Sequence, residues 1–190
     1  MGGKLVIFSA PSGAGKTTIV HSMLKAEPEL AFSVSACSRP KRDNETDGVD
    51  YYFLGVEGFK KRIESGDFLE WEEVYKDHFY GTLKSEVDRI WAKNMHVIFD
   101  VDVYGGINIK EKFGEKALAI FVMPPSMEIL EKRLRGRSTD SEENIQKRLK
   151  KSRHEITKAP KFDVVIVNDD LETAVAEAKN IVNAFLSNDA

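Results

Sequence analysis

The chain has 190 residues, of which 28 are basic and 31 acidic, so its formal net charge is −3. This length fits one domain with a full hydrophobic core, which buries about 70% of the unfolded chain's surface. The charge balance excludes a global attraction to nucleic acid or an anionic membrane, and no apolar run reaches the ~20 residues of a membrane span. With Cys37 as the only cysteine and no visible signal peptide, we expect a reducing, cytoplasmic location.

The first predicted element is a strand over 4–8 that leads directly into a glycine-rich loop, followed by a helix over 17–25. At such a junction backbone N–H groups favour a polyphosphate, Lys16 adds a positive charge, and the Thr17 hydroxyl is placed to ligate Mg²⁺. The usual pattern opens with glycine where this chain has Ala10, and the alternative is a glycine-rich turn without a ligand. We therefore predict ATP-phosphate contacts from a continuous run of residues: Pro11, Ser12, Gly13, Ala14, Gly15, Lys16, Thr17 and Thr18.

Three further apolar runs, over 95–102, 117–123 and 163–168, predict buried parallel strands. Each precedes a helical pattern, over 103–113, 126–134 and 171–186, which indicates a parallel sheet with helices on both faces. Ligands in such folds bind at the carboxyl ends of the strands, so the loop, Asp100, Asp102 and Asn168 should converge. We expect Asp100 to order Mg²⁺ waters or Lys16. The alternative is that Asp100 caps the helix that follows it.

Two segments interrupt this alternation. Residues 33–82 contain short strand patterns at 33–37, 51–54 and 68–74 and a helical pattern at 56–65, which predicts a small α+β insertion. Residues 133–158 are strongly charged and predicted to be helical. Without repeats or long linkers, the whole of 1–190 reads as one domain.

The insertion also carries a series of motifs: Ser35-Ala36-Cys37-Ser38-Arg39-Pro40-Lys41-Arg42, Asp50-Tyr51-Tyr52-Phe53, Phe68-Leu69-Glu70-Trp71 and Phe79-Tyr80-Gly81-Thr82. Asp100-Val101-Asp102, the arginine-rich segment and Asn168-Asp169-Asp170 follow. In this order and spacing the set resembles the guanylate kinase family from residue 4 to about residue 186. The resemblance implies an α/β fold with a three-layer P-loop NTPase core at 1–32, 83–125 and 159–190, a GMP-binding insertion at 33–82 and a helical lid at 126–158. It also implies Mg²⁺-dependent transfer of a phosphoryl group from ATP to GMP.

Carried over by residue, the resemblance assigns the GMP phosphate to Arg39, Arg42, Tyr51 and Tyr80, which are suitable hydrogen-bond donors for a dianion. Glu70 would accept from the guanine N1–H and 2-amino groups. Adenine has an acceptor at N1 and no 2-amino group, so it offers neither donor. The remaining GMP residues would be Ser35, Gly81, Thr82 and Asp102. The alternatives are a solvated basic loop, ordinary strand aromatics and, for Glu70, an exposed acidic strand face shared with Glu72 and Glu73.

In the lid, the resemblance points to Arg133, Arg137 and Arg148 closing over the ATP phosphates, with Lys16, Arg42, Arg137 and Arg148 as the catalytic set. Arg137 and Arg148 are eleven residues apart, about three helical turns, so they would project together if the segment between them is helical. Asn168 and Asp169 would contact the adenine. We expect neighbouring basic residues such as Arg135 to be solvated surface charges.

The chain departs from the family pattern in the basic loop, where Pro40 follows Arg39 directly and Asn44 precedes Glu45, and in the lid, where Ser138 replaces a common glycine. Asparagine tolerates a positive φ, so a tight turn at Asn44 is feasible. Two other functions remain: a non-catalytic guanylate-kinase-like binding module, which Lys16 disfavours, and a P-loop kinase for another acceptor, which Glu70 disfavours. We expect ATP and GMP as partners, no nucleic acid or membrane, and a monomer or weak homo-oligomer.

Overall fold

The computed structural model describes residues 3–136 and 141–188. Its central sheet has five parallel strands in the order β2-β7-β1-β8-β9. Leu5 of β1 pairs with Val97 of β7 on one side and Ala117 of β8 on the other. The strands are β1 (Leu5–Ser9), β2 (Leu30–Phe32), β7 (His96–Asp100), β8 (Ala117–Met123) and β9 (Val164–Val167).

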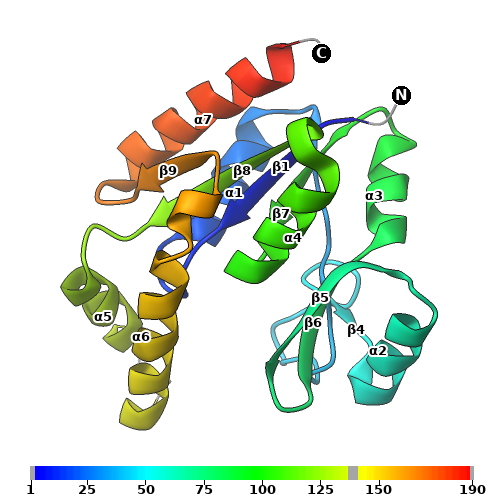
Figure 1. The fold of residues 1–190 in the computed structure, drawn as a ribbon, viewed down its shortest axis with the longest axis horizontal. Helices are drawn as coiled ribbons and strands as arrows, with labels where there is room; N and C mark the ends of the chain where they lie inside the picture. The colour runs from blue at the N-terminus through cyan, green and yellow to red at the C-terminus, as the bar shows by residue number, and fades with distance from the viewer. Residues whose placement is uncertain (1–2, 137–140, 189–190) are drawn as a thin grey trace.

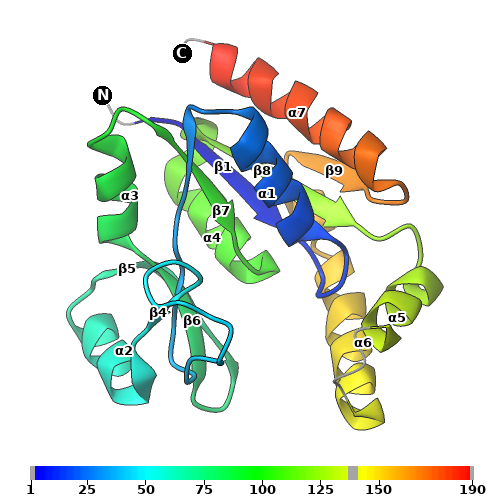
Figure 2. The same cartoon turned by 180° about the vertical axis from the view of Figure 1, so that it is seen from behind.

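Helices cover both faces of this sheet. Val6 and Phe8 point to the face covered by α1 (Lys16–Ala26) and α7 (Leu171–Ser187), while Leu5 and Ile7 point to α3 (Lys84–Trp91) and α4 (Val103–Phe113). Figure 1 shows α4 in front of the sheet, and Figure 2 shows α1 in front of it from the opposite side. Because successive strand side chains alternate between two buried faces, the strands are apolar almost throughout. The predicted three-layer α/β core with a parallel sheet is confirmed.

A second, four-stranded sheet lies beyond one end of the core, in the order β4-β3-β6-β5. Its strands are β3 (Ala36–Cys37), β4 (Tyr52–Phe53), β5 (Phe68–Tyr75) and β6 (His78–Leu83), and α2 (Gly55–Glu64) covers it. Phe59 of α2 stacks on Phe68 with ring centroids 4.3 Å apart. This small sheet therefore has an apolar core of its own.

Two helices follow β8: α5 (Met127–Arg135) matches the helical pattern predicted over 126–134, and α6 (Glu142–Ile156) lies within the charged segment predicted to be helical over 133–158. Each begins at a serine cap, because the side chains of Ser126 and Ser141 accept from backbone N–H groups. The helices pack through Leu130, Leu134, Ile145 and Leu149. Short 3₁₀ turns, η1 (Gly114–Lys116) and η2 (Ala159–Lys161), precede β8 and β9. The pair α5–α6 and the small sheet project from the same end of the core (Figure 1).

Within the described ranges, no helix combines the length and the apolar character needed to cross a bilayer.

Candidate active site

The glycine-rich loop joins β1 to α1 and is shaped by two glycines in the left-handed region. Gly13 has a φ of 94° and Gly15 a φ of 95°, which side chains disfavour. Gly15 is the N-cap of α1, and the first turn of that helix contains no acidic residue. The helix N-terminus thus presents backbone N–H groups and its positive dipole end to the space above the loop. That arrangement suits a polyphosphate.

Asp100 lies beside this loop because β7 is the neighbour of β1, with Phe8 opposite Asp100. The Thr17 hydroxyl donates to Oδ2 of Asp100 at 2.6 Å, and the Lys16 ammonium forms an ion pair with Oδ1. Burial lowers the pKa of Lys16 to about 8, although Asp102 and Glu155 oppose this effect. At neutral pH the side chain remains mainly an ammonium.

The alternative role for Asp100 as a helix cap is wrong, since the cap of α4 is Asp102, whose side chain accepts from the Gly105 N–H at 2.8 Å. The oxygens of Thr17 and Asp100 are hard ligands of the kind that Mg²⁺ prefers. No cluster of three or more His, Cys, Asp or Glu side chains suited to a metal occurs in 3–136 and 141–188. The pair therefore fits an ion that keeps several waters and shares phosphate oxygens, as Mg²⁺ does.

Glu70 occupies the other end of the site, on β5, where its side chain is only 9% exposed. Its Oε1 accepts from the hydroxyl of Thr82, directly across the hairpin on β6, at 2.6 Å. Burial raises the pKa of Glu70 to about 7; Asp102 and Glu72 act in the same direction, and the Thr82 hydrogen bond opposes them. The alternative of an exposed acidic strand face is thus wrong for Glu70.

Arg39 is engaged in a bidentate ion pair with Glu45, at 2.6 and 2.5 Å. Its guanidinium also lies 5.0 Å from the Tyr51 ring centroid, a cation–π distance. The hydrogen bonds from Arg39 hold the pKa of Glu45 at about 2. The sequence shows Glu45 three residues after Arg42 but does not reveal its pairing with Arg39.

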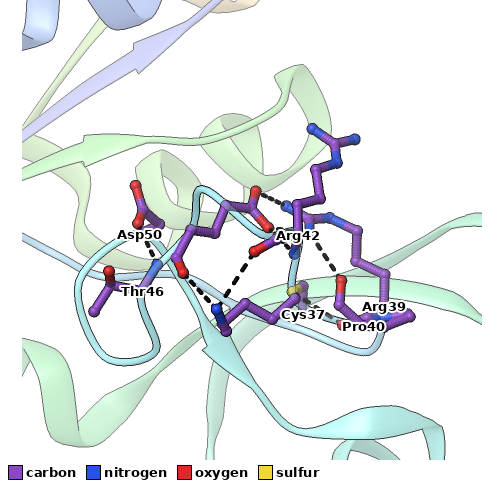
Figure 3. Close-up of polar contacts among 8 residues, drawn as sticks. Cys37, Arg39, Pro40, Arg42, Thr46 and Asp50 are labelled. Atoms are coloured by element: carbon purple, nitrogen blue, oxygen red, sulfur yellow. Dashed lines mark hydrogen bonds and ion pairs between the residues drawn. The ribbon is translucent and has the colours of Figure 1, made fainter.

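The Arg42 backbone N–H donates to the same carboxylate at 2.9 Å, and Figure 3 shows its side chain extending away from these contacts. The Glu45 N–H closes a turn onto the Arg42 carbonyl at 3.1 Å. Asn44, inside this turn, does not have a positive φ. Among the non-glycine residues that the structure describes, only Asp77 and Asn94 do. The chain therefore forms the turn at Asn44 without a positive φ.

A cavity of about 350 Å³ connects the phosphate loop to Glu70. The structure brings most predicted residues to its wall: Pro11, Ser12, Gly13, Gly15, Lys16, Thr17, Thr18, Ser35, Tyr51, Glu70, Tyr80, Gly81, Asp100 and Asp102. Residues that sequence reasoning missed also line it: Ala10, Glu72, Val74, Val101, Lys151 and Glu155. Lys151 and Glu155 come from α6, with Nζ and Oε1 3.5 Å apart, so this helix reaches the cavity.

Two predicted residues that do not line this cavity contact the phosphate loop. Arg148 of α6 approaches Ser12, with Nη1 3.4 Å from the hydroxyl oxygen, and lines a smaller adjoining cavity of about 220 Å³. Asn168 donates from Nδ2 to the Ala14 carbonyl at 2.7 Å, and its own carbonyl accepts from Arg133 at 3.0 Å. The walls do not include Ala14, Arg39, Arg42, Thr82, Arg133, Asn168 or Asp169, and Arg137 lies outside the described residues.

Oδ1 of Asn168 and Nη1 of Arg133 are among the buried polar atoms that find no hydrogen-bond partner in the described residues. They lie beside the phosphate loop, one an acceptor and the other a donor. Such atoms are costly to leave unpaired, and neither residue lines either of the two cavities.

Comparison with known proteins identifies a family. The family model described as guanylate kinase matches residues 2–185. A guanylate kinase of Bacteroides thetaiotaomicron is 56% identical over 98% of this chain and 92% of its own length, and one of Salinibacter ruber is 52% identical over 96% and 97%. The crystal structure of guanylate kinase from Anaplasma phagocytophilum matches with a TM-score of 0.80 and 31% identity over 98% of this chain and 87% of that one. The chain has the phosphate loop and the buried Glu70, and it matches these proteins over nearly its full length. It therefore belongs to the guanylate kinase family.

Proposed function

We propose that this protein transfers the γ-phosphoryl group of ATP to GMP, giving ADP and GDP, with Mg²⁺ as the metal. The proposal rests on one observation: the same cavity has Lys16 at one end and the buried carboxylate of Glu70 at the other. A kinase acting between two nucleotides needs both a polyphosphate site and a base-reading site on one cavity. The names of the curated relatives support the same activity.

On the donor side, the loop N–H groups and Lys16 hold the ATP phosphates, and Thr17 and Asp100 hold Mg²⁺. The ion, when bound, neutralises charge on the β- and γ-phosphate oxygens. Arg148 contacts the loop at Ser12, which supports a role for its guanidinium at the transferring group. Arg133 and Asn168 lie beside the phosphate loop, and we assign them to the donor nucleotide from the family resemblance. We assign Arg137 and Asp169 to the same side from the family resemblance.

On the acceptor side, Tyr51, Tyr80 and the basic loop bind the GMP phosphate. Arg39 is held beside Tyr51 by Glu45, and we assign its remaining N–H groups to the GMP phosphate from the family resemblance. Arg42, whose side chain points away from the loop contacts, completes this group in the proposal.

Glu70 selects the base because its carboxylate oxygens accept from the guanine N1–H and 2-amino groups, with Thr82 and Asp102 beside it. AMP presents an acceptor at N1 and no 2-amino group, so it would leave a buried carboxylate unpaired. Glu70 must be ionised to act in this way. Two donors from guanine favour the ionised form, which reverses the effect of burial on its pKa.

In the transfer, an oxygen of the GMP phosphate attacks the γ-phosphorus while the bond to the β–γ bridging oxygen breaks, and ADP leaves with the electron pair. The attacking phosphate oxygen is already ionised, so no general base is required. Lys16 and the arginines then stabilise charge on the equatorial oxygens. α6, which carries Arg148, Lys151 and Glu155, is the element that would exclude water from the cavity.

The decisive test is ADP formation by the purified protein with ATP and GMP, AMP, dTMP or no acceptor. We expect turnover with GMP well above the other three. Equal rates with AMP, or equal rates without an acceptor, would contradict the proposal. We also expect a monomer or weak homo-oligomer, which light scattering would test. Cell fractionation would test the expected cytoplasmic location.

A further inference from the structure

Glu86 is a buried acid that the proposed reaction does not use. It lies in the first turn of α3 and is only 3% exposed. The chain passes between the core and the small sheet twice, through residues 33–35 after β2 and through the junction of β6 with α3. Glu86 lies next to both connections.

The Glu86 carboxylate is fully engaged in hydrogen bonds. Oε2 accepts from the Val34 N–H at 3.0 Å and Oε1 from the Tyr52 hydroxyl at 2.8 Å. Arg89, one turn along α3, donates to both oxygens at 2.9 and 2.8 Å. Burial alone would raise the pKa of Glu86, but the hydrogen bonds, led by that of Arg89, bring it below its usual value.

Arg89 extends this network to the end of β2, because its Nη2 also donates to the Phe32 carbonyl at 3.3 Å. Phe32 and Val34 are therefore both fixed to α3, on either side of Ser33. Ser33 is fixed in turn to the core, since its N–H donates to the carbonyl of Ile98 in β7 at 3.0 Å. The chain is thus held at three successive residues, 32–34, where it leaves β2 and enters the first connection.

The groups bonded to Glu86 adjoin two residues of the cavity wall. Val34 precedes Ser35 and Tyr52 follows Tyr51, and both Ser35 and Tyr51 line the cavity. The Tyr52 N–H also donates to the Ser35 carbonyl at 2.9 Å, which links the two strands at this point. An altered position of Val34 or Tyr52 would therefore move side chains that face GMP.

We propose that Glu86 is a positioning residue that sets the orientation of the small sheet against the core, and through it the placement of Ser35 and Tyr51 for GMP. The inference rests on the proposed function, since it takes GMP as the ligand of the small sheet. The apolar core of that sheet is built around Phe59, Phe68 and Phe79. Loss of the Glu86 network thus leaves this packing in place and acts on how the sheet is held.

The test compares Glu86→Gln and Tyr52→Phe with Asp88→Asn, a matched acid-to-amide change at an exposed position of the same helix. Calorimetry gives the Kd for GMP and for a non-hydrolysable ATP analogue, and urea unfolding gives the stability of each variant. We expect Glu86→Gln to raise the Kd for GMP about tenfold, the effect of one lost hydrogen bond to a charged group. Tyr52→Phe should raise it about threefold.

The Kd for the ATP analogue should stay within about twofold for all variants, and Asp88→Asn should match the wild type throughout. A lower free energy of unfolding with an unchanged Kd for GMP in both test variants would show that Glu86 only supports the fold. If Glu86→Gln does not fold, Tyr52→Phe alone decides between these outcomes. A wild-type protein that does not bind GMP would overturn the proposed function itself, which is a separate result.

Discussion

The buried carboxylate of Glu70 should make the unliganded protein less stable at high pH. Its pKa is raised from 4.5 to about 7 in the folded chain, so folding favours the protonated form. The stability that this group contributes is present below about pH 4.5 and is lost as the pH rises through about 7. The shift corresponds to about 3 kcal/mol against the folded state once Glu70 is ionised.

Glu70→Gln removes this penalty while keeping an oxygen that can accept from Thr82. We expect the variant and the wild type to have similar free energies of unfolding near pH 4, and the variant to be more stable by about 3 kcal/mol near pH 8.5. Urea unfolding at the two pH values measures this difference. Glu64→Gln, at an exposed position at the end of α2, is the control, and its effect should be the same at both.

Added GMP should reverse the order at high pH, because it binds the ionised carboxylate of the wild type and stabilises the folded protein by mass action. A difference between Glu70→Gln and the wild type that does not change between the two pH values would refute the reasoning. So would a variant that is less stable near pH 8.5.

Further predictions concern the phosphate end of the cavity. Lys16→Met should keep the circular dichroism spectrum but lose most turnover, and a variant with more than about a tenth of the wild-type kcat would contradict the role of this cation. Arg148→Ala should lower kcat sharply while the calorimetric Kd for GMP stays within a few-fold; a large rise in that Kd with kcat preserved would place Arg148 in the acceptor site. Asp100→Asn should raise the Mg²⁺ concentration for half-maximal velocity about tenfold, and an unchanged Mg²⁺ dependence would exclude Asp100 from the metal site.

The core could be predicted because β1, β7, β8 and β9 are apolar runs followed by helical patterns. The sequence did not indicate β2, which has only three residues after a proline-containing turn. It also did not indicate α3, since one of the three residues that this helix buries is Glu86, an acid that weakens the apolar periodicity. The start of α6, which we predicted at about residue 133, had a readable signal, because Ser141 followed by Glu142 and Glu143 is typical of a helix start.

In the site, the loop, Asp100 and Glu70 could be predicted because motif spacing fixes residues on strands that the fold brings together. The Arg39–Glu45 pair and the contact of Asn168 with Ala14 could not. The first depends on the path of an irregular loop, and the second joins residues 154 positions apart in the chain. The cavity residues of α6, Lys151 and Glu155, depend on how two helices pack, which local pattern does not specify.

The central claim, that a buried carboxylate at Glu70 makes this P-loop protein a kinase for GMP, is tested most directly by the ratio of kcat/KM for GMP to kcat/KM for AMP. The wild type should favour GMP strongly, and Glu70→Gln should reduce the ratio by at least about tenfold, mainly through a lower kcat/KM for GMP. The amide presents a donor to the guanine donors, so it cannot replace the carboxylate. An unchanged ratio in a folded Glu70→Gln variant would contradict the account and move base recognition to another residue.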